Sequence, residues 1–92
     1  MILSFKNEEA RRIFDGAHSR RYSTIQQGVE RKLRMLHRAR VVEDLTQPPG
    51  NRLERLKGNR VGQFSIRVND QFRICFRWES GNAYEVEIVD YH

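Results

Sequence analysis

Two stretches of alternating residues decide the fold: QFSIRV over residues 63–68 and FRICFRW over residues 72–78. In both, large apolar side chains occupy every second position, a period of two that is typical of a strand with one buried face. Asn69-Asp70, between them, has the residue types of a hairpin turn. We therefore predict two adjacent antiparallel strands whose apolar sides face the same way.

The alternation continues toward the C-terminus and extends the hairpin into a three-stranded meander. Ser80-Gly81-Asn82 supplies the second turn. After this turn, the residues expected on the apolar face are Tyr84, Val86 and Ile88, and those expected on the polar face are Glu85 and Glu87. A sheet with one apolar face must be covered by other elements.

The residues before this sheet predict two helices that can cover it. Asn7, followed by two glutamates, is typical of an N-cap, and the helix it begins should run from about 8 to 15 and end at Gly16. Ser23 or Thr24 is expected to cap a second helix that runs to about residue 39. The apolar face of this second helix is formed by Ile25, Val29, Leu33 and Leu36.

These elements predict an α+β fold with the order β-α-α-β-β-β, in which an antiparallel sheet packs on two N-terminal helices. The first strand would come from Ile2, Leu3 and Phe5, and a short helical turn is expected over residues 41–45. The Pro48–Asn51 cluster should mark the boundary between helices and sheet. With 92 residues, the chain has room for one domain, which we place at residues 1–92.

Charge favours a polyanionic partner. The chain has 17 Lys and Arg against 12 Asp and Glu, a net charge of +5. The excess is concentrated at about +6 in residues 17–40 and about +4 in residues 57–78. The single cysteine, Cys75, excludes an internal disulfide and fits a reducing compartment, and no apolar segment predicts a membrane anchor or signal peptide.

The polar face of the sheet is expected to carry a charged surface suited to RNA chemistry. It should present Arg67, Arg73, Arg77, Glu85, Glu87 and Tyr91. Lys57 and Arg60 lie in the loop that enters the sheet, and the chain ends at Asp90-Tyr91-His92. Cleavage of RNA needs an activated or aligned 2′-hydroxyl, a cation beside the phosphorane and a proton for the leaving 5′-oxygen. Arg73 could supply the cation, His92 or Tyr91 the proton, and Lys57 or Asp90 could assist the nucleophile.

Structural explanations exist for the same residues. Arg77 could form a cross-strand ion pair with Glu85 or Glu87, and Arg73 could also belong to an ion pair. Lys57 could be an ordinary turn lysine, and His92 could be frayed at the terminus. The stripe of Arg31, Arg34 and Arg38 on the second helix is either a solvated face or a contact for rRNA or another polyanion. A non-catalytic module that binds RNA, DNA or a protein through the same basic face is therefore an alternative to an enzyme.

The strings LERLKGNRVGQFSIRVNDQFRICFRW (53–78) and EIVDYH (87–92), with the opening ILSFKN (2–7), resemble the HigB family of bacterial toxins in the RelE superfamily. This resemblance implies a microbial RNase-like fold and an mRNA interferase, usually ribosome-dependent, that cleaves mRNA in the A site and arrests growth. It also implies the bacterial cytoplasm, the 70S ribosome and mRNA as partners, and neutralisation by a helix-turn-helix antitoxin, HigA. The toxin would reach operator DNA only through the antitoxin complex. The resemblance predicts no metal or other cofactor, and the sequence has no Gly-rich phosphate loop or ligand cluster that would indicate one.

The resemblance also assigns residues. Lys57 matches the active-site lysine of the family, Arg73 its central arginine, and Asp90, Tyr91 and His92 its functional ending. We expect Arg60, Arg67 and Arg77 to contact RNA phosphates, and Arg31, Arg34 and Arg38 to dock on the ribosome. Glu54 stands where a better-known member has a histidine three residues before the lysine, and we hypothesise that it pairs with Arg52 or Lys57. A degenerate toxin that binds its antitoxin without cleaving RNA is a third reading.

Overall fold

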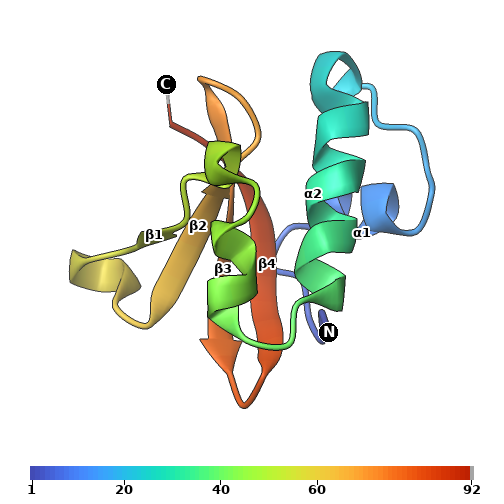
Figure 1. The fold of residues 1–92 in the computed structure, drawn as a ribbon. Helices are drawn as coiled ribbons and strands as arrows, with labels where there is room; N and C mark the ends of the chain where they lie inside the picture. The colour runs from blue at the N-terminus through green and yellow to red at the C-terminus, as the bar shows by residue number, and fades with distance from the viewer. Residues whose placement is uncertain (92) are drawn as a thin grey trace.

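Two helices cover one face of a four-stranded antiparallel sheet (Figure 1). The computed structural model describes residues 1–91, so the predicted catalytic residue His92 lies outside the described residues. The helices are α1 (Glu8–Phe14) and α2 (Gln26–Arg38), and the strands are β1 (Glu54–Arg55), β2 (Gln63–Arg67), β3 (Phe72–Glu79) and β4 (Asn82–Asp90). Short 3-10 turns over Ser23–Ile25, Val42–Thr46, Pro49–Asn51 and Gly58–Arg60 connect them. The predicted α+β arrangement is confirmed.

The register of the sheet places one polar row across its open face. Ser65 of β2 lies opposite Cys75 of β3, which lies opposite Glu87 of β4. Because paired residues share a face, the predicted alternation of polar and apolar sides is confirmed along β2 and β3.

A β-bulge in β4 changes the prediction for Tyr84. Cys75 pairs with Glu87 but Arg77 pairs with Tyr84, so two residues of β4 lie opposite one of β3, and Glu85 has a φ of 53°. The expectation that Tyr84 points to the apolar face is therefore wrong. Tyr84 lies on the open face, where the guanidinium carbon of Arg77 is 4.7 Å from its ring centroid.

The same bulge explains why the N-terminal segment is not a continuous strand. Ile2 and Phe5 form isolated parallel bridges with Ala83 and Val86 of β4. Between them, the bulged Glu85 donates its backbone N–H to the Ser4 hydroxyl at 2.9 Å instead of to a neighbouring backbone carbonyl. The fourth strand of the sheet is instead β1, at the opposite edge, where Glu54 and Arg55 pair with β2.

The helices follow the predicted pattern except at the start of α2. The Asn7 side chain accepts the Ala10 N–H at 2.8 Å, which confirms the N-cap of α1. Ser23 and Thr24 do not cap α2, because they lie in a 3-10 turn and the α-helix begins at Gln26. The Gln26 side chain takes over the connection by accepting the backbone N–H of residue 19 and donating to the carbonyl of residue 17.

The core lies between α2 and the sheet. Val29, Leu33 and Leu36 of α2 are fully buried, as are Ile74 and Phe76 of β3. The arginines at positions 31, 34 and 38 are exposed on the opposite face of α2, as predicted. None of the helices described in residues 1–91 is long and apolar enough to cross a membrane.

Candidate active site

Arg73 lies on the open face near the start of β3 and is held by three hydrogen bonds. Its Nε donates to the Ser65 hydroxyl at 2.8 Å, and its Nη2 donates to the carbonyls of Arg52 at 2.6 Å and Ser65 at 3.3 Å. All three acceptors are neutral, and Arg73 forms no ion pair with residues 1–91. Within that part of the chain the ion-pair alternative for Arg73 is therefore wrong, and its positive charge is not offset by a carboxylate.

The arrangement leaves part of the guanidinium available. Among residues 1–91, no hydrogen bond uses Nη1, which carries two N–H groups. Each of these N–H groups can donate a charge-assisted hydrogen bond to a phosphate oxygen. Arg73 is thus positioned by three bonds while its remaining donors can bind an anion.

The Tyr91 ring lies near Arg73, and its hydroxyl lies near Cys75. The Arg73 guanidinium carbon is 5.9 Å from the Tyr91 ring centroid, and the Tyr91 hydroxyl lies 3.8 Å from the Cys75 sulfur. Burial, and then the neighbouring Cys75, raise the pKa of the Tyr91 hydroxyl above its ordinary value. Burial also raises the pKa of the Cys75 thiol. Both groups therefore keep their protons at neutral pH, and Tyr91 can donate one.

Arg60 belongs to a separate ion cluster on the same face. Its Nη1 donates to Glu87 at 3.0 Å and to the Gln63 side chain at 3.1 Å, and the Lys6 ammonium lies 3.7 Å from Glu87. The hydrogen bond to Glu87 raises the pKa of Arg60. Glu87 thus holds Arg60 in place beside the row formed by Ser65, Cys75 and Glu87 itself.

The other two predicted phosphate ligands are also paired with acids. Arg67 forms an ion pair with Asp70 in the β2–β3 turn. Arg77 contacts Glu79 at 2.9 Å and Glu85 at 3.2 Å. The predicted cross-strand pair of Arg77 with Glu85 is confirmed, and the alternative pair with Glu87 is not formed.

Asp90 lies on the face of the sheet opposite to Arg73, and Lys57 lies outside the strands. Asp90 pairs with Phe72, which places it on the opposite side of the sheet, and its carboxylate accepts the Gln71 amide at 3.2 Å. Lys57 is exposed just before the Gly58–Arg60 turn. Glu54 is exposed opposite Ser65 and forms no ion pair with Arg52 or Lys57, so the pairing hypothesis for Glu54 is wrong within the described chain.

Sequence reasoning missed two groups that hold Arg73, the Ser65 hydroxyl and the Arg52 carbonyl. The alternation places Ser65 on the open face, which was a usable signal. A backbone carbonyl 21 residues before Arg73 carries no side-chain signal, and only the turn that precedes β1 brings it there.

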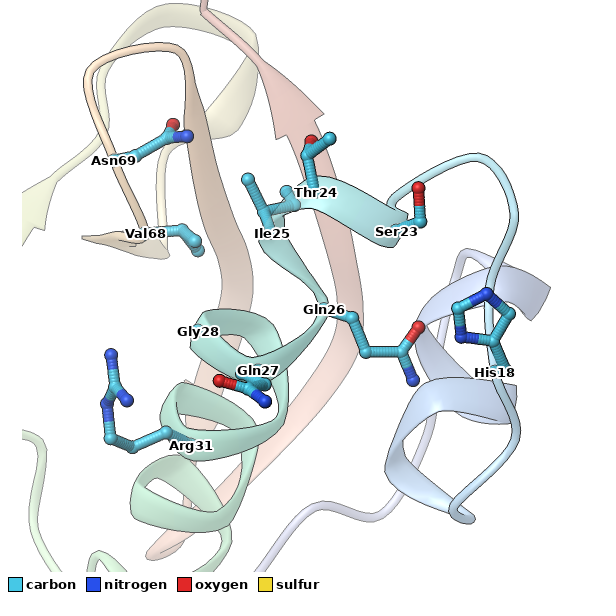
Figure 2. A pocket seen from close by; sticks show the side chains of 10 residues that line it. All are labelled: His18, Ser23, Thr24, Ile25, Gln26, Gln27, Gly28, Arg31, Val68 and Asn69. Carbon is cyan, nitrogen blue, oxygen red and sulfur yellow. The ribbon is translucent and has the colours of Figure 1, made fainter.

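A hollow of about 550 Å³ lies away from this site (Figure 2). It is formed between the start of α2 and the β2–β3 turn, and its lining includes His18, Gln27, Arg31 and Asn69. It contains one residue of the predicted docking stripe, Arg31, and none of the predicted catalytic residues that the structure describes.

Comparison with known proteins identifies the family. A family model described as the RelE-like toxin of the type II toxin-antitoxin system HigB matches residues 3–92. The chain belongs to the HigB-like toxin family. Toxin HigB-1 of Vibrio cholerae is 42% identical over 85 residues, 90% of each chain. The Endoribonuclease HigB of Proteus vulgaris is 31% identical over 93 residues and covers both chains fully.

A solved structure confirms the fold of this HigB-like toxin. A chain of the YoeB-YefM complex from Staphylococcus aureus aligns with a TM-score of 0.58 over 100% of this chain and 98% of its own, at 15% sequence identity. At that identity the likeness concerns the backbone arrangement. The family model over residues 3–92 and the two HigB relatives confirm the sequence-based assignment to the HigB and RelE group.

Proposed function

We propose that this HigB-like toxin is an endoribonuclease that cleaves mRNA by attack of the 2′-oxygen, without a metal. The observation that carries the proposal is Arg73, which is fixed in the open face by three hydrogen bonds and which, among residues 1–91, has no carboxylate partner and no bond from its two Nη1 N–H groups. The name of the Proteus vulgaris relative, Endoribonuclease HigB, supports the same activity.

In the proposed step, a bond forms between the 2′-oxygen and phosphorus while the bond from phosphorus to the 5′-oxygen breaks. The products are a 2′,3′-cyclic phosphate and a 5′-hydroxyl end. Arg73 balances the charge of the phosphorane, a role in which removal of one donor typically lowers kcat about 10²–10³-fold. Arg60, Arg67 and Arg77 bind flanking phosphates.

Two protons move in this step. The 5′-oxygen receives one from Tyr91, whose ring centroid lies 5.9 Å from the Arg73 guanidinium carbon, or from His92. The 2′-hydroxyl gives the other to water, with Lys57 as the described residue that aligns this nucleophile. Because Asp90 lies on the opposite face of the sheet from Arg73, we assign it to positioning the C-terminal ending.

We further propose that the ribosome supplies the alignment that this small site lacks. Holding mRNA kinked for in-line attack in the A site is an orientation effect that can be worth several kcal/mol. Arg31, Arg34 and Arg38 on the outer face of α2 would contact rRNA of the 70S ribosome. A HigA-type antitoxin in the bacterial cytoplasm would neutralise the toxin, and the toxin would reach DNA only through that complex.

Primer extension on a defined mRNA, with and without programmed ribosomes, tests the cleavage proposal. We expect cleavage by the wild type only with ribosomes, a loss of about 10²-fold or more in Arg73→Ala, and no change in Arg12→Ala, which removes the same charge from α1. Cleavage of free RNA would retain the nuclease and reject the ribosomal alignment. No cleavage by folded protein in either condition would favour a degenerate toxin or a binding module.

Ribosome binding at several salt concentrations tests the docking stripe. The double variant Arg34→Glu, Arg38→Glu should bind more weakly and reduce the salt slope by roughly two, because each phosphate contact contributes about one. The control variant Arg11→Glu, Arg12→Glu changes the net charge equally on α1. Equal effects of the two variants would mean that net charge, and not docking by the stripe, accounts for the weaker ribosome binding.

A further inference from the structure

A buried polar pair outside the site ties α2 to the turn before β1. Asn51 is 0% exposed, and its amide nitrogen donates to the carbonyls of Leu45 at 3.1 Å and Gln47 at 3.2 Å and contacts the Met35 sulfur at 3.1 Å. Its side-chain oxygen accepts the ammonium of Lys32, a residue of α2 that is 9% exposed. Every polar atom of the Asn51 side chain is thus bonded, to two elements at once.

Arg52, the residue after Asn51, holds Arg73 through its backbone carbonyl, which accepts a hydrogen bond from Nη2 of Arg73. The backbone N–H of Asn51 donates to the Pro48 carbonyl at 2.9 Å and that of Arg52 to the Pro49 carbonyl at 3.1 Å. Arg52 then has the left-handed backbone angles φ 46° and ψ 54°, which turn its carbonyl toward Nη2 of Arg73 at 2.6 Å. The position of this carbonyl therefore depends on how the Pro49–Asn51 turn is anchored.

We propose that Lys32 and Asn51 form a clamp that positions the guanidinium of Arg73 through the Arg52 carbonyl. Both are positioning residues, because neither reaches the open face of the sheet. The consequence for catalysis rests on the proposed function, whereas the positioning itself does not.

The environment of Lys32 supports a role beyond stability. Burial, and then the nearby charges of Arg31 and Arg67, lower the pKa of Lys32, so this ammonium is held where its charge is disfavoured. An apolar residue would fill the same place without that penalty. The hydrogen bond to Asn51 is what the ammonium provides there.

The first test compares Asn51→Ala with Ile13→Ala, a core variant in α1 on the far side of the molecule from this turn (Figure 1). The readout is NMR of the arginine side chains, with Arg73 assigned by Arg73→Lys. A guanidinium held at Nη2 rotates slowly about its Nε–Cζ bond and gives separate Nη1 and Nη2 signals. We expect these signals to merge or broaden in Asn51→Ala and to stay separate in Ile13→Ala.

The second test measures kcat and KM for cleavage on programmed ribosomes. We expect Asn51→Ala to lower kcat about tenfold with KM unchanged, and Ile13→Ala to leave kcat per folded molecule unchanged. In an Arg73→Lys background, the effect of Asn51→Ala should largely disappear, since the residues act through one group. If Asn51→Ala does not fold, Lys32→Met, which keeps the two carbonyl partners of Asn51, takes its place, with an expected two- to threefold loss.

The outcomes separate the two proposals. Unchanged Arg73 signals in the folded clamp variant overturn the clamp, whatever the activity. If the Arg73 signals change in Asn51→Ala but the wild-type protein cleaves no RNA, the clamp is retained and the proposed function is rejected. Equal loss of kcat in Asn51→Ala and Ile13→Ala would assign the clamp to stability alone.

Discussion

Replacing Ser65 with alanine removes the hydroxyl oxygen that accepts the Nε–H of Arg73 at 2.8 Å. Ser65 is fully buried and alanine differs from it by one atom, so the change creates almost no cavity. Hydrogen bonds to charged groups contribute about 1.5–3 kcal/mol. Because Arg73 is only half-buried and water can replace part of the bond, we take the lower end, about 1.5 kcal/mol.

This magnitude converts to a rate. If the bond holds Arg73 in the geometry needed for the phosphorane, its loss raises the barrier by about 1.5 kcal/mol, which is roughly a tenfold fall in kcat. Arg73→Ala should be more severe, about 10²–10³-fold, because the donor itself is lost. The two variants should therefore rank in that order.

The assay is single-turnover cleavage of a defined mRNA on programmed ribosomes, with the fraction folded measured by circular dichroism in the same buffer. Ser65→Thr, which keeps a hydroxyl, serves as the conservative control and should retain most of the rate. A wild-type kcat in folded Ser65→Ala would refute the reasoning, because Arg73 would then need no support from the Nε side.

Three other experiments have defined outcomes. The first is the pH–rate profile of cleavage. If Tyr91 donates the proton, its raised pKa keeps the rate from falling between pH 7 and pH 9, whereas a fall with a midpoint near the ordinary histidine pKa of about 6.5 would assign the acid to a histidine. Glu87→Gln removes the charge paired with Arg60 at 3.0 Å, and urea unfolding should show a loss of about 1 kcal/mol that shrinks in high salt; an equal loss at all salt concentrations would exclude an ionic origin. Gly81 has a φ of 79°, and a Cβ added there would lie 3.4 Å from the Arg40 carbonyl oxygen. Gly81→Ala should therefore lower the free energy of unfolding by about 1 kcal/mol or more, which would appear as a Tm fall of roughly 4–8 °C. An unchanged Tm would mean that the turn relaxes.

The part of the fold that follows from periodicity was predictable. Alternation along β2 and β3 identified the open face and put Ser65, Arg73 and Cys75 on it. The prediction failed at Tyr84 because a bulge adds one residue to a strand without any break in the alternation of residue types.

The site itself was predictable only in its side chains. Arg73 on the open face and Tyr91 near it were expected from the residues and the resemblance. The Arg52 carbonyl was not expected, since every residue has a carbonyl and only the chain path selects one. Asn51 was interpreted as part of a breaker cluster. Its contacts with α2 arise from tertiary packing between segments 19 residues apart.

The covered position of Cys75 makes the wild-type chain its own reporter of motion on the open face. Its side chain lies on that face but has no exposed surface, and the Tyr91 hydroxyl lies 3.8 Å from its sulfur. A thiol reagent can therefore label it only in molecules in which the covering side chains have moved aside or a strand has separated, and the labelling rate follows the population of those open forms. The same rate, measured with an antitoxin or a ribosome present, would report how far each of them shields the site.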